Sequence, residues 1–117
     1  MAVEASILNT IKGLLGPDDD YDVFDQDIIV FINSALATLC QVGVGPSEGF
    51  RITGDRETWD DFIGDSERLE SVKEYVYMKV KMAFDPPTSS FVMSAYQDTC
   101  NELLWRINVA TDPGKYE

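Results

Sequence analysis

The chain of 117 residues contains no histidine and only two cysteines, Cys40 and Cys100. Zinc sites take most of their ligands from these two residue types, so a typical zinc centre is nearly excluded. Serine and cysteine side chains also lack a histidine to activate them as nucleophiles. We therefore expect no metal, no cofactor, no catalytic residue and no enzymatic activity. The cysteines are expected to be free and buried, as in a reducing compartment.

Basic residues are also scarce. Nine lysines and arginines stand against 21 aspartates and glutamates, which gives a formal net charge of −12. Such a surface repels phosphates, so ordinary nucleic-acid binding is not expected. No run of 18 apolar residues is present, and the N-terminus lacks the basic and apolar regions of a signal peptide. The sequence therefore predicts cytoplasmic production and no membrane partner.

Apolar residues repeat at helical spacing over four segments, near residues 5–15, 23–42, 66–84 and 89–108. Ser6 is the expected N-cap of the first segment, and Asp25 and Asp27 lie in the first turn of the second, where carboxylates suit the helix dipole. The predicted fold is mainly α, a small bundle of about four helices. It divides into a helical domain of residues 1–108 and a flexible C-terminal tail of residues 109–117.

The segment of residues 46–64 is the least helical part of the chain. Residues 50–53 alternate as in a short strand, and Gly54-Asp55 fits a tight turn. The sequence therefore predicts a short β-hairpin or loop insertion between the second and third long helices. Trp59, Phe62 and Ile63 are expected to form a short helical turn over the core, closed by Gly64.

Two prolines, Pro86 and Pro87, separate the last two helices. Proline lacks the N–H of the helical ladder and disfavours helical geometry in the residue before it, so Asp85 should end the third helix. Thr88 or Ser89 is then the expected cap of the fourth. These features predict two stiff helices joined by a fixed elbow.

The third helix carries two apolar stripes on roughly opposite sides, so it needs two packing partners. Leu69, Val72, Val76, Val80 and Ala83 form the first stripe. Tyr75, Met78 and Met82 form the second, which is either ordinary core or a contact with a neighbouring subunit, because methionine and aromatic residues are enriched at interfaces.

The main stripe of the fourth helix consists of Val92, Ala95, Tyr96, Thr99, Leu103 and Ile107. Trp105 projects away from that stripe. An indole in this position is a candidate anchor for a partner protein.

Three patterns that suggest ligand chemistry fail on inspection. Aspartates crowd residues 18–27, but a calcium loop that began at Asp18 would need a glycine and a glutamate where Val23 and Ile29 stand. Gly43, Gly45 and Gly49 match neither nucleotide-binding motif. The carboxylates of residues 57–70 are better explained as a charged surface than as an acid–base pair.

Several ordered segments of the chain resemble a known family. They are Ser6–Lys12, Asp27–Ser34, Gln41–Pro46, Trp59–Gly64, Val76–Pro87, Ser90–Met93 and Glu102–Asn108. Together they are similar to the head–tail connector (adaptor) proteins of long-tailed bacteriophages. The likeness covers nearly the whole chain, although no single segment is diagnostic.

This resemblance implies a helical virion protein, made in the host bacterial cytoplasm, whose copies form a ring beneath the portal, usually of about twelve. The ring extends the DNA channel, through which double-stranded DNA passes without specific binding, and receives a downstream stopper or tail-completion protein. C-terminal segments of such adaptors commonly reach toward the portal. That role is expected here of Trp105, Arg106, Asn108, Lys115 and Tyr116. An acidic bore would let DNA slide without sticking.

Two other functions compete with a connector. An acidic mimic of DNA that inhibits a DNA-binding protein would also explain the net charge, and it should be a monomer or dimer with carboxylates along one face. A small hydrolase would need a cleft and an activated group, and the sequence provides neither.

Overall fold

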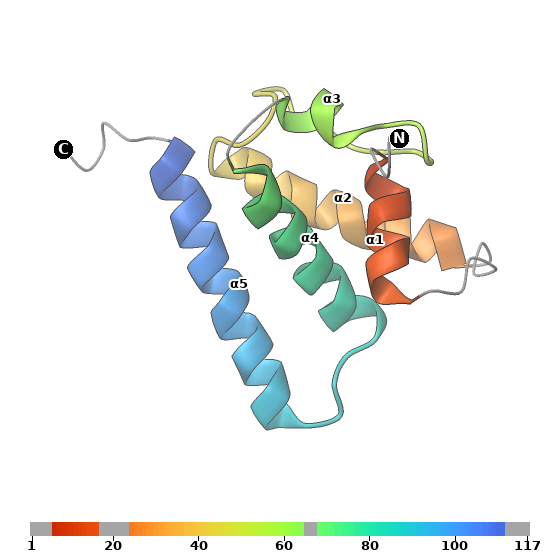
Figure 1. Ribbon diagram of the computed structural model, residues 1–117, viewed down its shortest axis with the longest axis vertical. Helices are drawn as coiled ribbons and strands as arrows, with labels where there is room; N and C mark the ends of the chain where they lie inside the picture. The colour runs from red at the N-terminus through yellow and green to blue at the C-terminus, as the bar shows by residue number, and fades with distance from the viewer. Residues whose placement is uncertain (1–5, 17–23, 65–67, 112–117) are drawn as a thin grey trace.

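The computed structural model describes residues 6–16, 24–64 and 68–111, and these form five helices (Figure 1). The helices are α1 (Ile7–Leu15), α2 (Asp25–Gln41), α3 (Trp59–Ile63), α4 (Leu69–Phe84) and α5 (Ser90–Thr111). The mainly α class and the small bundle of four long helices are confirmed. The helical turn predicted over residues 59–63 is the short helix α3.

Helix α4 lies at the centre of the bundle. It packs against α1 and α2 and, as the antiparallel partner, against α5, which forms one edge of the molecule (Figure 1). The core is apolar, and it includes a set of side chains with no exposed surface from α1, α2, α4 and the loop before α3: Ile7, Ile11, Ile32, Leu36, Leu39, Val44, Ile52, Val72, Val76 and Val80. The helices are thus held by burial of the faces that the periodicity predicts.

The predicted helix ends are confirmed on either side of the elbow. The Asp85 backbone N–H donates to the Lys81 carbonyl oxygen at 2.8 Å and closes α4. The Ser89 hydroxyl accepts from the Val92 backbone N–H at 3.3 Å and caps α5. The Ser6 hydroxyl likewise accepts from the Asn9 backbone N–H at 3.2 Å at the start of α1. Helix α5 runs to Thr111, three residues beyond its predicted end.

The predicted β-hairpin is not found, since residues 50–55 form no strand. The segment is a loop that bends at residues 53–55, and the buried Ile52 stands between the exposed Arg51 and Thr53 as the alternation predicts. The backbone of Ile52 pairs with the side chain of Asn33 on α2 and not with another strand. The Asn33 amide donates to the Ile52 carbonyl oxygen at 3.0 Å and accepts from the Ile52 N–H at 2.7 Å. One amide side chain therefore replaces the neighbouring strand that the alternation suggested.

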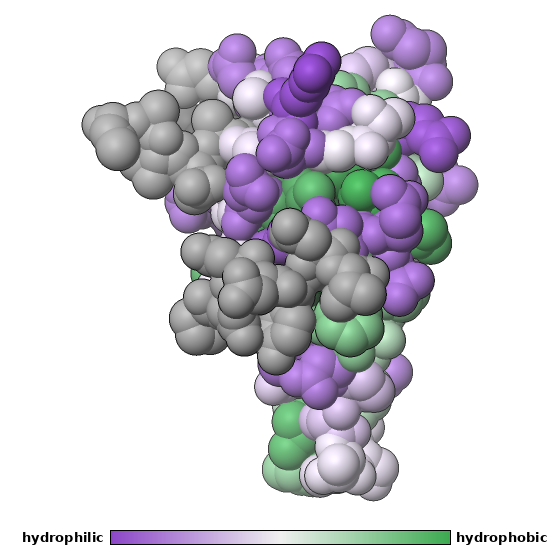
Figure 2. Space-filling model, turned by 90° about the vertical axis from the view of Figure 1, so that its right-hand side faces the viewer, coloured by the Kyte–Doolittle hydropathy of each residue, from purple (hydrophilic) through white to green (hydrophobic). Residues whose placement is uncertain are grey.

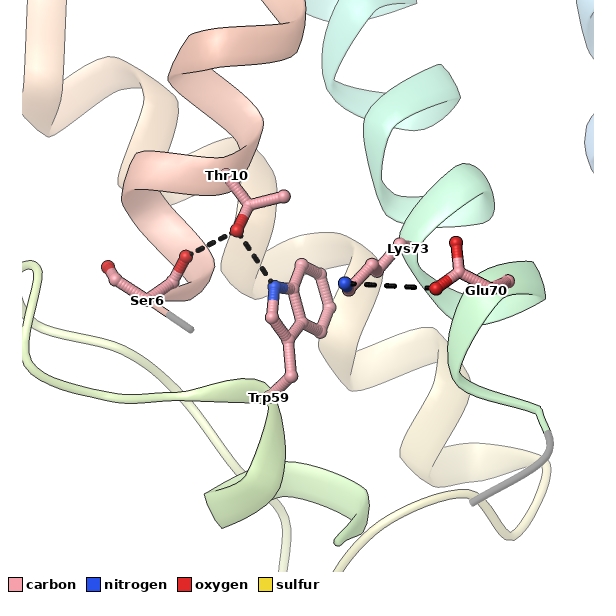
Figure 3. Close-up of polar contacts among 5 residues, drawn as sticks. All are labelled: Ser6, Thr10, Trp59, Glu70 and Lys73. Carbon is pink, nitrogen blue, oxygen red and sulfur yellow. Dashed lines mark hydrogen bonds and ion pairs between the residues drawn. The ribbon is translucent and has the colours of Figure 1, made fainter. Parts of the chain in front are cut away.

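Trp59 ties α3 to the N-terminal half of the chain (Figure 3). Its indole N–H donates to the Thr10 hydroxyl of α1 at 3.1 Å, and that hydroxyl donates to the Ser6 carbonyl oxygen at 2.7 Å. On the α4 side, the Lys73 ammonium lies 6.0 Å from the centre of the indole ring. The Ile7 N–H also donates to the Glu57 carbonyl oxygen at 3.0 Å. The loop before α3 is therefore fixed to α1 through Glu57, and Trp59 at the start of α3 contacts both α1 and α4.

Candidate interaction surfaces

Tyr75 belongs to the core, which is the first of the two alternatives predicted for its stripe. Its side chain is 2% exposed, with Thr38 of α2 and Cys100 of α5 as neighbours. Burial raises the pKa of its hydroxyl, and the nearby Cys100 thiol adds to the shift. The physical reason is the elbow, which folds α5 back onto α4. The second packing partner that α4 needs at Tyr75 therefore comes from the same chain.

Met78 and Met82 are partly buried and pack against the core. Met82 also lines an open groove of about 380 Å³ between α2, α4 and α5. The groove is bordered by Phe31, Ser34, Ala35, Lys79, Met82, Ala83, Met93 and Gln97. Lys79 is the only charged residue among them, so this surface is mainly apolar in a chain whose overall charge is strongly negative.

The first ten residues of α5 are only partly covered. Among the residues of this helix whose burial the structure describes, Cys100, Leu103 and Ile107 are buried, and none of residues 90–99 is. The predicted main stripe of α5 therefore reaches the core only in part. The reason is the groove, which separates Met93 and Gln97 of α5 from the facing residues of α2. Phe91, near the start of the helix, is 83% exposed.

The α4–α5 connection and the start of α5 contain no charged residue. Charged residues make up 26% of the chain, yet none occurs from Pro86 to Gln97. Figure 2 shows the consequence at the narrow lower end of the molecule, where the α4–α5 connection and the start of α5 lie. That end is covered mostly by weakly polar and apolar residues, whereas strongly hydrophilic residues crowd the wider part above. A long uncharged stretch in an acidic sequence was the signal that sequence reasoning missed.

The other end of α5 presents Trp105, which is 61% exposed and points away from the core as predicted. Arg106 beside it is exposed and forms an ion pair with Glu102 one turn earlier. Asn108 is partly buried. Lys115 and Tyr116 lie outside the described residues. The structure thus brings Trp105 and Arg106 to one exposed helix end, about 21 Å along α5 from Phe91 at 1.5 Å per residue.

The pKa shifts of Cys40, Cys100 and Glu57 follow from burial and local hydrogen bonds. Cys40 and Cys100 are free, and burial raises the pKa of both thiols. Burial also acts to raise the pKa of Glu57, but hydrogen bonds from backbone N–H groups and the Thr53 hydroxyl outweigh it and leave this pKa lowered. Within residues 6–16, 24–64 and 68–111, no cluster of three potential metal ligands occurs. The aspartates at 18, 19, 20 and 22 lie outside those ranges.

Across the part of the chain that the structure describes, no helix combines the length and the apolar character that a membrane span requires.

A family model described as phage connector protein matches residues 7–114, which include all five helices. No curated protein and no solved structure matches the chain.

Proposed function

The chain belongs to the phage connector protein family, and from this membership we propose that its copies form a ring beneath the portal, extend the DNA channel and join the head to the tail. The coarser role follows from the family itself: the protein is a structural component of the virion that connects phage head and tail. The match over residues 7–114 is the observation that carries the proposal.

The exposed surfaces of the structure support an assembly role. A ring requires that two different faces of each subunit meet. The chain exposes large apolar side chains at Phe91 and Trp105, at opposite ends of α5, and it has a mainly apolar groove beside Met82. Exposed aromatic residues in such positions are typical anchors of protein interfaces.

We assign contact with the portal or a neighbouring neck protein to Trp105 and Arg106, together with Asn108 and the tail residues Lys115 and Tyr116. The exposure of Trp105 supports this assignment. A Trp105→Ala substitution should weaken binding of the purified protein to portal without changing its helical content. A Val30→Ala substitution is a suitable control, because Val30 is also exposed, at 62%, but lies on α2.

The test of the function uses the phage that encodes the chain. Mass spectrometry of purified virions should detect the protein, and gold-labelled antibody should bind at the neck. A nonsense mutation in its gene should yield DNA-containing heads and free tails that do not join. Virions without the protein, or infectious particles formed by the mutant, would contradict the proposal. Stable binding to a DNA-binding enzyme rather than to portal would favour the acidic mimic instead.

A further inference from the structure

We infer that Phe91 of one copy of this chain docks into the groove between α2, α4 and α5 of a second copy. The inference rests on the proposed function, because it locates the contact between subunits of the ring. It depends on three observations: the exposure of Phe91, the groove beside Met82, and the distribution of charge around both.

Electrostatics restricts where two copies can meet. Each copy carries a net charge of −12, so most approaches of one copy to another are repulsive. The stretch from Pro86 to Gln97 is free of charge and mostly exposed. A second copy can therefore approach this end of the molecule at the smallest electrostatic cost. A partner that is strongly basic would instead favour the acidic remainder of the surface.

The groove can receive the Phe91 side chain of a second copy. Its walls include Phe31, Ala35, Met82 and Met93, and its volume of about 380 Å³ is ample for an aromatic side chain. Its one charged border residue is the exposed Lys79, which has no ion-pair partner among the described residues. A lone positive charge beside an apolar groove attracts an acidic neighbour and disfavours a basic one.

The positions of Phe91 and the groove are what a repeating assembly needs. Met93 and Gln97 face the groove, and at about 100° per residue Phe91 lies about 200° around the helix from Met93. The protruding ring and the groove therefore occupy opposite sides of the same half of α5. When Phe91 of one copy occupies the groove of another, the pair still has one free Phe91 and one free groove. Further copies can add in the same sense until the ring closes.

The first test is cross-linking between copies in a Cys40→Ser background, which removes the more exposed native thiol. Protein with Ser34→Cys is mixed with protein with Ser94→Cys, and the mixture is oxidised; Ser94 is exposed, lies about one turn after Phe91 and leaves the Phe91 ring in place. Ser34 lies on the border of the groove, so a disulfide should join one copy of each kind. A mixture of Ser34→Cys with Trp105→Cys is the control, since Trp105 lies at the other end of α5. Equal yields from both mixtures, or mainly links between identical copies, would overturn the inference.

The second test measures self-association by analytical ultracentrifugation. Phe91→Ser should weaken association by about 30-fold or more, as expected for loss of a central aromatic anchor. Because Phe91 is 83% exposed, this variant should keep the helical content and melting temperature of the parent. Val30→Ser, which removes another exposed apolar side chain, should leave association unchanged. Lys79→Glu should weaken association, and higher salt should strengthen it in the parent by screening repulsion.

A third experiment places both cysteines in one chain and oxidises virions that carry it. Its outcomes distinguish failure of the inference from failure of the proposed function. A ladder of oxidised multimers from the pair Ser34→Cys and Ser94→Cys supports the inference. Virions that contain the chain but give no ladder overturn it and leave the connector function standing, with the groove then open to another neck protein. Virions that lack the chain overturn both.

Discussion

Replacement of Asn33 by alanine should remove the attachment between α2 and the loop that precedes α3. The Asn33 amide makes two hydrogen bonds with the backbone of Ile52, at 3.0 Å and 2.7 Å, and Ile52 is fully buried. Water cannot readily take over either bond, so the variant leaves a buried N–H and a buried carbonyl unsatisfied.

The expected loss of stability follows from these two bonds. A net contribution of about 1 kcal/mol for each bond gives about 2 kcal/mol, and an unsatisfied buried backbone group raises the cost to about 1–3 kcal/mol apiece. Alanine recovers about 0.5 kcal/mol through its higher helix propensity. We therefore expect Asn33→Ala to lower the free energy of unfolding by about 1.5–5.5 kcal/mol.

Urea unfolding followed by far-UV circular dichroism measures this difference, and amide hydrogen exchange at Ile52 reports the lost bond directly. Asn33→Asp keeps the acceptor for the Ile52 N–H but loses the donor, so it should cost less than Asn33→Ala. Asn101→Ala is the matched control, because Asn101 is exposed on α5 and its replacement should be neutral or slightly stabilising. A loss under about 1 kcal/mol for Asn33→Ala, or unchanged protection of the Ile52 amide, would refute the reasoning.

Three further predictions test other parts of the fold. Gly45 has φ 86°, and a Cβ there would lie 2.5 Å from Phe62, so Gly45→Ala should destabilise by about 2–4 kcal/mol in urea unfolding. Gly49 has a similar φ but open space around it, so Gly49→Ala should reduce stability less. Equal losses of stability for the two variants would exclude the contact with Phe62 as the cause. Trp59→Phe should lower the unfolding midpoint by loss of about 1–2 kcal/mol, because it deletes the buried hydrogen bond to α1, and an unchanged midpoint would contradict that role. Hydrogen bonds lower the pKa of Glu57 in the folded state, so Glu57 stabilises the fold above its unfolded-state pKa and this stabilisation is lost as pH falls through the folded-state pKa. Glu57→Gln should therefore flatten the dependence of the free energy of unfolding on pH in acid. Parallel plots of that free energy against pH for the parent and the variant would disprove this.

The protein's assembly surfaces differ in how visible they are from sequence. The exposure of Trp105 could be predicted, because Trp105 lies outside the apolar stripe of its own helix. The structure shows it exposed. The burial of Tyr75 could not, because its stripe has the same composition whether it packs on a second helix of the chain or on another subunit. Phe91 was not singled out either; its ring is exposed because it lies on the side of α5 away from the groove, and only the packing of α5 decides which side faces solvent.

The sequence by itself determined the helical class, the positions of the long helices, and the helix ends at Ser6 and on either side of the two prolines. These depend on local periodicity, on capping by Ser6 and Ser89 and on the conformational restriction at Pro86 and Pro87. It also determined the acidity that limits how copies of the chain can approach one another. Tertiary structure alone decided that one asparagine side chain takes the place of a strand beside Ile52, that α5 covers Tyr75, and that Phe91 and the groove face opposite ways. Each of these depends on contacts between residues far apart in the chain, and no local pattern specifies which distant group will supply a hydrogen bond or bury a side chain.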